Sequence, residues 1–146
     1  MPATGCSSVA ENFDIVINPI PVITPVSDYT YCANASAGPY TIGGNGITGV
    51  TYNWTSTKDI GFGLSGTGNI GSYTALDSTN QTIIDTVIIT AVGSPCPGKK
   101  DTFVITVKPQ PTVNAVSSQT VCAGISTTTI NFSGNNPSGV VYNWTG

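Results

Sequence analysis

The side chains that could do chemistry are few in this chain and stand far apart. Among 146 residues there are 7 acidic side chains, 4 lysines and no histidine or arginine. Without histidine there is no imidazole to activate a serine or cysteine nucleophile or to bind a metal. Without arginine there is no bidentate phosphate contact, and the net charge of −3 repels nucleic acid. The sequence therefore predicts no catalytic residue, no enzyme activity and no nucleic-acid partner.

The carboxylates form no catalytic or metal-binding pattern. A glycosidase needs two facing carboxylates and a calcium loop needs several oxygen ligands at short spacing, whereas these residues stand singly along the chain. We therefore expect no cofactor-binding residue and no metal site. One exception stays open, a structural calcium ion at a joint between domains, to which Asp28, Asp59 or Asp77 would supply one ligand together with carbonyl oxygens.

Residues 61–66 spell GxGxxG, the pattern of a dinucleotide-binding loop. That loop works where it follows a buried strand and opens a helix, so that the helix N-terminus meets the pyrophosphate. Here the helix-breaking residues Thr67, Gly68 and Asn69 come next. The segment is therefore interpreted as a glycine-rich loop between strands.

The element that positions all these residues is an internal repeat. When the chain is shifted by 90 residues against itself, 19 of the 50 positions from 6 to 55 are identical to those from 96 to 145. The Pro-x-Pro steps at 19–21 and 109–111 are stiff and extended, and they cannot continue a ladder. The pattern predicts the C-terminal strand of a preceding repeat over 1–20, one whole repeat over 21–110, and the N-terminal part of a following repeat over 111–146.

Alternation and β-branched residues predict an all-β fold, since no stretch shows helical periodicity with caps. Seven or so short strands in one repeat are typical of an immunoglobulin-like β-sandwich, here repeated in tandem. No apolar run approaches the ~20 residues of a membrane span, so none is expected. The predicted strands of the whole repeat are 22–26, 29–32, 39–43, 48–55, 60–64, 70–75, 82–92 and 101–107.

The aromatic residues have two competing interpretations. A Tyr-Asn-Trp-Thr segment at 52–55 recurs at 142–145, which suits a core strand shared by every repeat. The alternative is an exposed platform for a sugar, built from Tyr40, Tyr52 and Trp54. We favour the first, and the predicted core includes Trp54, Tyr52, Phe103 and Trp144.

Each repeat carries two cysteines, which suggests disulfides in an oxidising compartment; without histidine or a CxxC pair, zinc is disfavoured. Cys32 and Cys96 are the only pair within the whole repeat. A standard sandwich would hold them at opposite poles, roughly 30 Å apart, whereas a disulfide needs Cα atoms within about 7 Å. Bridges between neighbouring repeats are the alternative, with Cys6 and Cys122 pairing outside this chain, and free thiols are a third.

Three segments carry a family resemblance: residues 111–124 (PTVNAVSSQTVCAG), 140–145 (VVYNWT) and 66–75 (GTGNIGSYTA). They resemble the PKD-like, immunoglobulin-like repeats of very large surface proteins of Bacteroidota, such as the giant gliding-motility adhesins. The resemblance covers essentially the whole chain. The Phe-Gly-Asp-Gly that follows Trp in the PKD signature is replaced by Thr-Ser-Thr-Lys at 55–58, so the similarity is to the PKD-like variant.

This resemblance implies a structural or adhesive function outside the cell. Such repeats are exported by the type IX secretion system and displayed on the outer surface, as filament stalks or as adhesive surfaces in attachment and gliding. The implied partners are neighbouring repeats, surface polysaccharide or other surface proteins, and the implied O-glycan acceptors are Thr86 and Ser78. The alternatives are a carbohydrate-binding accessory module of a secreted enzyme and a protein–protein docking module of a surface machine.

Overall fold

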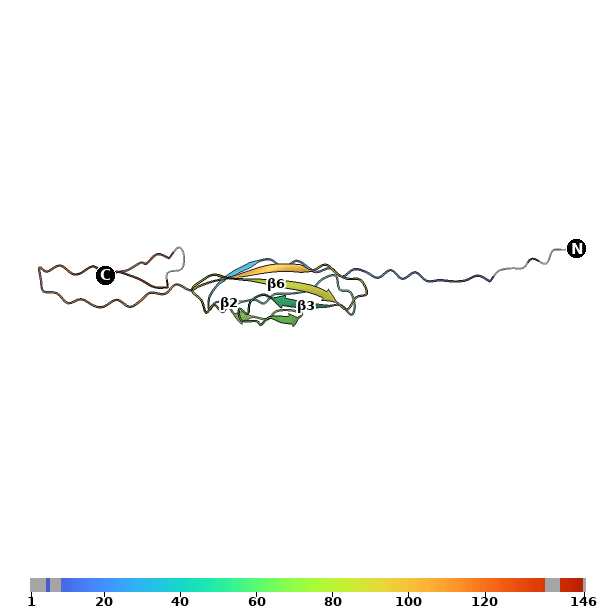
Figure 1. The fold of residues 1–146 in the computed structure, drawn as a ribbon, viewed down its shortest axis with the longest axis horizontal. Coiled ribbons are helices and arrows are strands. Elements are labelled where there is room, and N and C mark those ends of the chain that lie inside the picture. The colour runs from blue at the N-terminus through green and yellow to red at the C-terminus, as the bar shows by residue number, and fades with distance from the viewer. Residues whose placement is uncertain (1–4, 6–8, 136–139, 146) are drawn as a thin grey trace.

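The structure is a computed structural model of the chain, and it describes residue 5, residues 9–135 and residues 140–145 (Figure 1). Within these ranges the fold is all-β and contains no helix, and hence none that could cross a membrane. The seven strands are β1 (Tyr29–Cys32), β2 (Ser36–Ala37), β3 (Thr51–Ser56), β4 (Ser65–Thr67), β5 (Tyr73–Thr74), β6 (Ile83–Val92) and β7 (Asp101–Lys108).

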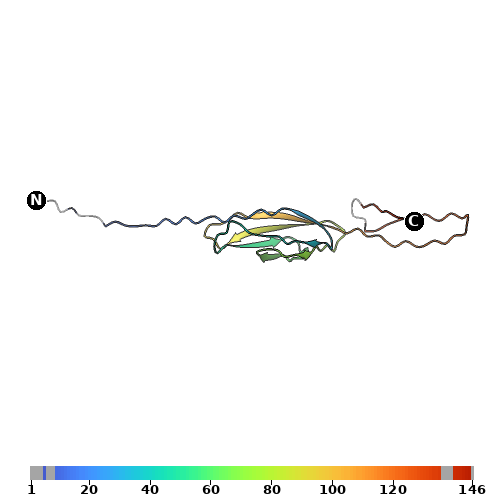
Figure 2. The same ribbon diagram turned by 180° about the vertical axis from the view of Figure 1, so that it is seen from behind.

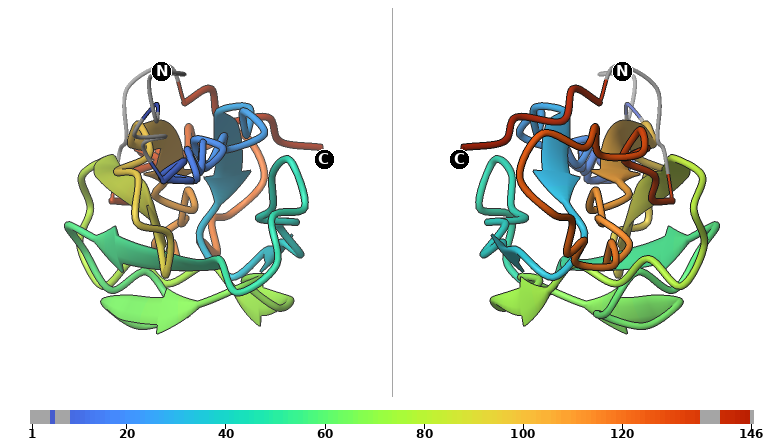
Figure 3. Two further views of the ribbon diagram at one scale, coloured as in Figure 1. Left: turned by 90° about the vertical axis from the view of Figure 1, so that its right-hand side faces the viewer. Right: turned by 90° about the vertical axis from the view of Figure 1, so that its left-hand side faces the viewer.

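The strands form two sheets in an arrangement compatible with a β-sandwich. The larger sheet has the order β1-β7-β6-β3-β4, and the smaller one pairs β2 with β5. In the larger sheet β1 runs parallel to β7, with Tyr29 opposite Ile105 and Cys32 opposite Lys108, whereas all other neighbours are antiparallel. Seen along the long axis of the molecule, the strands surround a common interior (Figure 3).

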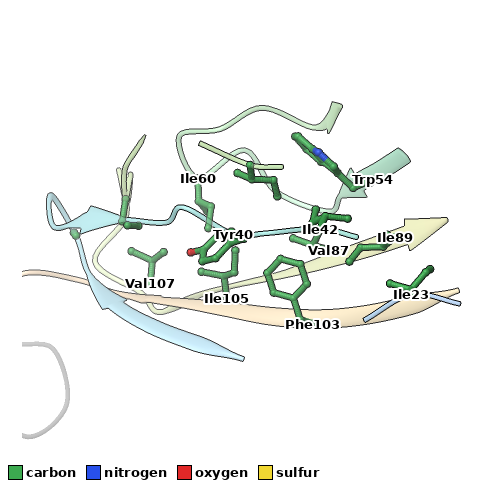
Figure 4. Close-up of a cluster of buried hydrophobic side chains, with 14 residues drawn as sticks. Ile23, Tyr40, Ile42, Trp54, Ile60, Val87, Ile89, Phe103, Ile105 and Val107 are labelled. Carbon is green, nitrogen blue, oxygen red and sulfur yellow. The ribbon is translucent and has the colours of Figure 1, made fainter. Parts of the chain in front are cut away.

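The interior is filled from the alternating residues of the two longest strands. In β6 and β7 every second residue points inward, as the period of two in a strand requires, so Val87, Ile89 and Phe103 are at most 1% exposed. Tyr40 meets them from the opposite layer (Figure 4). The other buried hydrophobic residues are Ile23, Ala33, Ala37, Ile42, Trp54, Ile60, Ile70, Ala75, Ile105 and Val107. Because all of them lie between residues 23 and 107, residues 21–110, the central unit, carry their own core.

The chain enters and leaves the central unit at opposite ends. Residues 9–20 run away from one end as an extended segment, and residues 111–135 and 140–145 lie beyond the other (Figures 1 and 2). Neither flank contains a strand in its described part. The molecule is therefore elongated along the direction of its main strands.

The predicted strands agree with the observed ones where alternation is long, in β6 and β7. The predicted strands at 22–26 and 39–43 are wrong, since they reduce to isolated bridges at Ile23 and Tyr40; each contains a proline, which cannot donate to a ladder. The predicted strand at 60–64 is also wrong. Gly61 and Gly63 there have φ of 121° and 90°, so the chain loops and β4 begins only at Ser65.

Candidate functional site

Two of the aspartates considered for calcium serve the local backbone. Asp28 Oδ1 accepts a hydrogen bond of 2.7 Å from the amide of Val104, in β7. Asp77 Oδ1 accepts from the amide and the hydroxyl of Thr79, at 2.7 and 2.8 Å. Groups of three or more potential metal-ligating side chains are absent among the described residues. These carboxylates therefore hold a strand and a turn in place.

Asp59 closes the glycine-rich loop at 61–66. Its Oδ1 accepts hydrogen bonds from the amides of Gly61 and Gly63, both at 3.0 Å. These two bonds lower the pKa of the Asp59 carboxyl below its usual value. The amides that a phosphate would need are thus already bonded to the chain's own carboxylate.

Asp85 is a buried carboxylate that sequence reasoning missed. It is 0% exposed, and four donors surround it. Its Oδ2 accepts from the hydroxyl of Ser56 at 2.8 Å, and its Oδ1 accepts from the amide and hydroxyl of Thr57 and the amide of Lys58, each at 2.9 Å. A buried charge is tolerated only with such partners. The available signal was alternation, because Asp85 holds the inward position next before Val87.

The two glycosylation candidates differ in accessibility. Ser78 is exposed in the segment before β6. Thr86 is half-buried within β6, and its amide donates to the hydroxyl of Thr57 at 2.9 Å. Of the two, Ser78 offers the freer acceptor.

The predicted core residues fall into two groups. Trp54 and Phe103 are 6% and 1% exposed, and Tyr52 is half-buried and packs against the core. Trp144 is 73% exposed, so its place in a core is corrected here. The contacts that cover Trp54 come from Phe62 and Gly66, whose counterparts 90 residues later fall beyond position 146.

Tyr40 belongs to the interior and not to an aromatic platform. It is 2% exposed, and its ring packs edge-on against Phe103, with 5.4 Å between the centroids. Its hydroxyl lies 3.0 Å from that of Tyr73. Burial, foremost, raises the pKa of both phenols above the ordinary value of a tyrosine. With Trp54 also buried, the side chains proposed for sugar binding in the central unit face its core (Figure 4).

The joint at the N-terminal end of the central unit is held by Asn45. Its Nδ2 donates to the carbonyl of Ile20 at 3.0 Å, and its Oδ1 accepts from the amide of Val22 at 3.1 Å. The side chain thus spans the buried Pro21. One amide fixes the direction in which the chain crosses from the flank into the unit.

The same clamp recurs at the other joint, 90 residues later. Asn135 Nδ2 donates to the carbonyl of Gln110 at 2.7 Å, and its Oδ1 accepts from the amide of Thr112 at 2.8 Å. The turn that follows the first cysteine of each repeat also recurs, with amide-to-carbonyl bonds of 3.1 Å from Ala35 to Cys32 and from Ile125 to Cys122. The sequence repeat is therefore accompanied by a repeat of local geometry at both joints.

The cysteines lie at opposite ends of the central unit. Cys32 ends β1, while Cys96 precedes β7, which starts at Asp101 and runs parallel to β1. The length of β7 alone, eight residues, separates them by more than about 20 Å, too far for a disulfide. Cys32, Cys96 and Cys122 are free thiols, so a bridge between Cys32 and Cys96 is not formed here. Cys6 lies outside the described residues.

Comparison with known proteins adds no relative to this picture: no protein family, no curated protein and no solved structure matches the chain.

Proposed function

We propose that the chain is a segment of a long, tandemly repeated cell-surface protein, in which immunoglobulin-like sandwiches form a stalk or an adhesive fibre. The observation that carries this proposal is the pair of joints. The chain passes through the central unit from end to end (Figure 1), and the same asparagine clamp holds it at 20–22 and at 110–112. Repeated units connected in this way extend in one direction.

The pairing of β1 with β7 suits such a fibre under tension. The two strands are parallel over four residue pairs, and they are the first and last strands of the unit. Tension on the ends pulls β1 toward one pole and β7 toward the other. The ladder between them is then loaded in shear, so its bonds must fail together and not one after another.

The setting of the fibre is taken from the resemblance to PKD-like repeats of Bacteroidota surface proteins. That resemblance supports export by type IX secretion, display on the outer surface, a role in attachment or gliding, and no enzyme activity. The composition agrees with an exposed fibre, since only 8% of residues are charged, against roughly 25% in ordinary domains. Ser, Thr and Asn together make up 48 residues and give a neutral, hydrated surface.

The stalk is favoured over a carbohydrate-binding module because Tyr40 and Trp54 are buried in the core. It is favoured over a docking module because the repeated features lie at the joints, where one unit meets the next. In the proposed fibre the principal partners of the central unit are therefore its neighbours in the same chain.

Antibodies and scattering would test this proposal. An antibody against residues 21–110 should label intact cells of the source organism, and small-angle scattering of the 146-residue chain should give the profile of a rod. A compact particle, or labelling only after the cells are opened, would contradict it.

A further inference from the structure

The two cysteines of the central unit mark its two ends, and each lies beside the chain where a neighbour would begin. Cys32 is the last residue of β1, is exposed, and stands opposite Lys108 in the parallel pair with β7. It is therefore placed at the joint through which the chain leaves the unit.

Cys96 occupies the other joint. Its Sγ donates to the carbonyl of Asn18, 3.5 Å away, and its side chain is half-buried. Asn18 immediately precedes the Pro-x-Pro step at 19–21. Cys96 thus lies against the last residue of the flank, before the chain enters the central unit.

Asn18 and Lys108 occupy the same position of the 90-residue repeat. At each joint, the last residue before Pro-x-Pro would therefore have two thiols beside it. One belongs to the unit that ends there and stands across the parallel pair, as Cys32 does from Lys108. The other belongs to the unit that begins there, as Cys96 does beside Asn18. Paired strands are ≈ 4.8 Å apart, so both cysteines come within the Cα range of a disulfide, about 4.4–6.8 Å.

We infer that Cys32 forms a disulfide with the counterpart of Cys96 in the following unit, and that Cys96 does so with the counterpart of Cys32 in the preceding one. The inference rests on the tandem arrangement proposed above. The oxidant is a small-molecule disulfide: one thiolate attacks it, the second displaces the mixed disulfide, and two thiols result. The two protein thiols lose two electrons and two protons in all.

Such bridges would make the fibre inextensible. A covalent path then runs from Pro21 to Cys32, crosses to the counterpart of Cys96, follows β7 of that unit and enters the next. It contains 12 and 15 residues, or 27 for every 180 of the chain. Fully extended, it spans about 95 Å for two units, against about 630 Å for an unbridged chain. Because β1 and β7 are already extended strands, tension has little slack to release.

The test uses residues 9–110 followed directly by a second copy of residues 21–110, since the central unit carries its own core. After oxidation with glutathione disulfide, non-reducing peptide mapping should find Cys32 of the first copy joined to Cys96 of the second, with the other two thiols free. A bridge within one copy, or four free thiols, would overturn the inference.

Matched variants of the same chain locate the bridge. Cys32→Ser in the first copy should abolish it, whereas Cys32→Ser in the second copy should leave it intact. Scattering of the reduced sample separates the two proposals. A rod without a bridge contradicts only the disulfide, and a compact particle contradicts the stalk.

Discussion

The central unit and its flanks contain many of the same residues in different surroundings. Phe103 and Ile105 of β7 are 1% and 0% exposed, whereas their counterparts Phe13 and Ile15 are 82% and 76% exposed. The asparagine clamp, in contrast, forms in both regions. The clamp closes within 25 residues of chain, while the burial of β7 needs β1 and β6. Local geometry therefore follows from local sequence, and burial follows only when distant strands are present.

The largest test of this difference replaces the same residue in both regions. Phe103→Ala should lower the free energy of unfolding by about 3–5 kcal/mol, because it leaves a cavity in the core. Phe13→Ala should change it by less than about 0.5 kcal/mol, as exposed positions do. Urea unfolding followed by the fluorescence of Trp54 measures both. Equal losses for the two variants would mean that the flank shares the core of the central unit.

A second test concerns the buried carboxylate, which has no counterpart in either flank. Asp85→Ala should cost about 3 kcal/mol, since it strands the hydroxyl and amide donors of Ser56, Thr57 and Lys58 without an acceptor. Asp85→Asn keeps one acceptor oxygen and should cost less. Thermal unfolding of the two variants gives their order, and an Asn variant as unstable as the Ala variant would show that charge, not hydrogen bonding, matters here.

The features that could be predicted from the sequence are those whose signal is local. Alternation located β6 and β7, and the 90-residue identity located joints whose contacts then recur. Asp85 was missed because its donors lie 27 to 29 residues away in the sequence. The parallel register of β1 on β7 was also beyond local patterns, since the residues it pairs are 76 apart, as Tyr29 is from Ile105.

Trp144 shows the same limit from the other side. Its segment repeats that of Trp54 residue for residue over 142–145, and identical sequence suggested identical burial. The exposure of Trp144 depends instead on the absence of a covering loop such as the one around Phe62. Placement in a core is thus a property of the whole unit, which no four-residue motif contains.

A third test uses alkaline pH, which acts on the core of the central unit. The pKa of Tyr40 is raised above the usual value near 10, so the phenol stays neutral in the folded state while it ionises in the unfolded chain. This contribution to stability is present below pH 10 and is lost as the pH rises further. Tyr40→Phe should reduce the slope of stability against pH by about 1.4 kcal/mol per unit there. Tyr142→Phe in the flank is the control, and an unchanged slope for Tyr40→Phe would contradict the assignment.

The smallest effect is expected at the joints, where the two regions are alike. Asn45→Ala and Asn135→Ala each remove two hydrogen bonds between exposed groups, so each should change the free energy of unfolding by about 1 kcal/mol or less. Their effect on order should be local: hydrogen exchange should quicken at the amide of Val22 in the first variant and of Thr112 in the second, because these amides lose their acceptors. Since the clamp needs only its own short segment, the two accelerations should be similar, although one joint leads into a core and the other does not. Faster exchange at Val22 alone would mean that the clamp depends on the packed unit, and that the likeness of the two joints ends at their sequence.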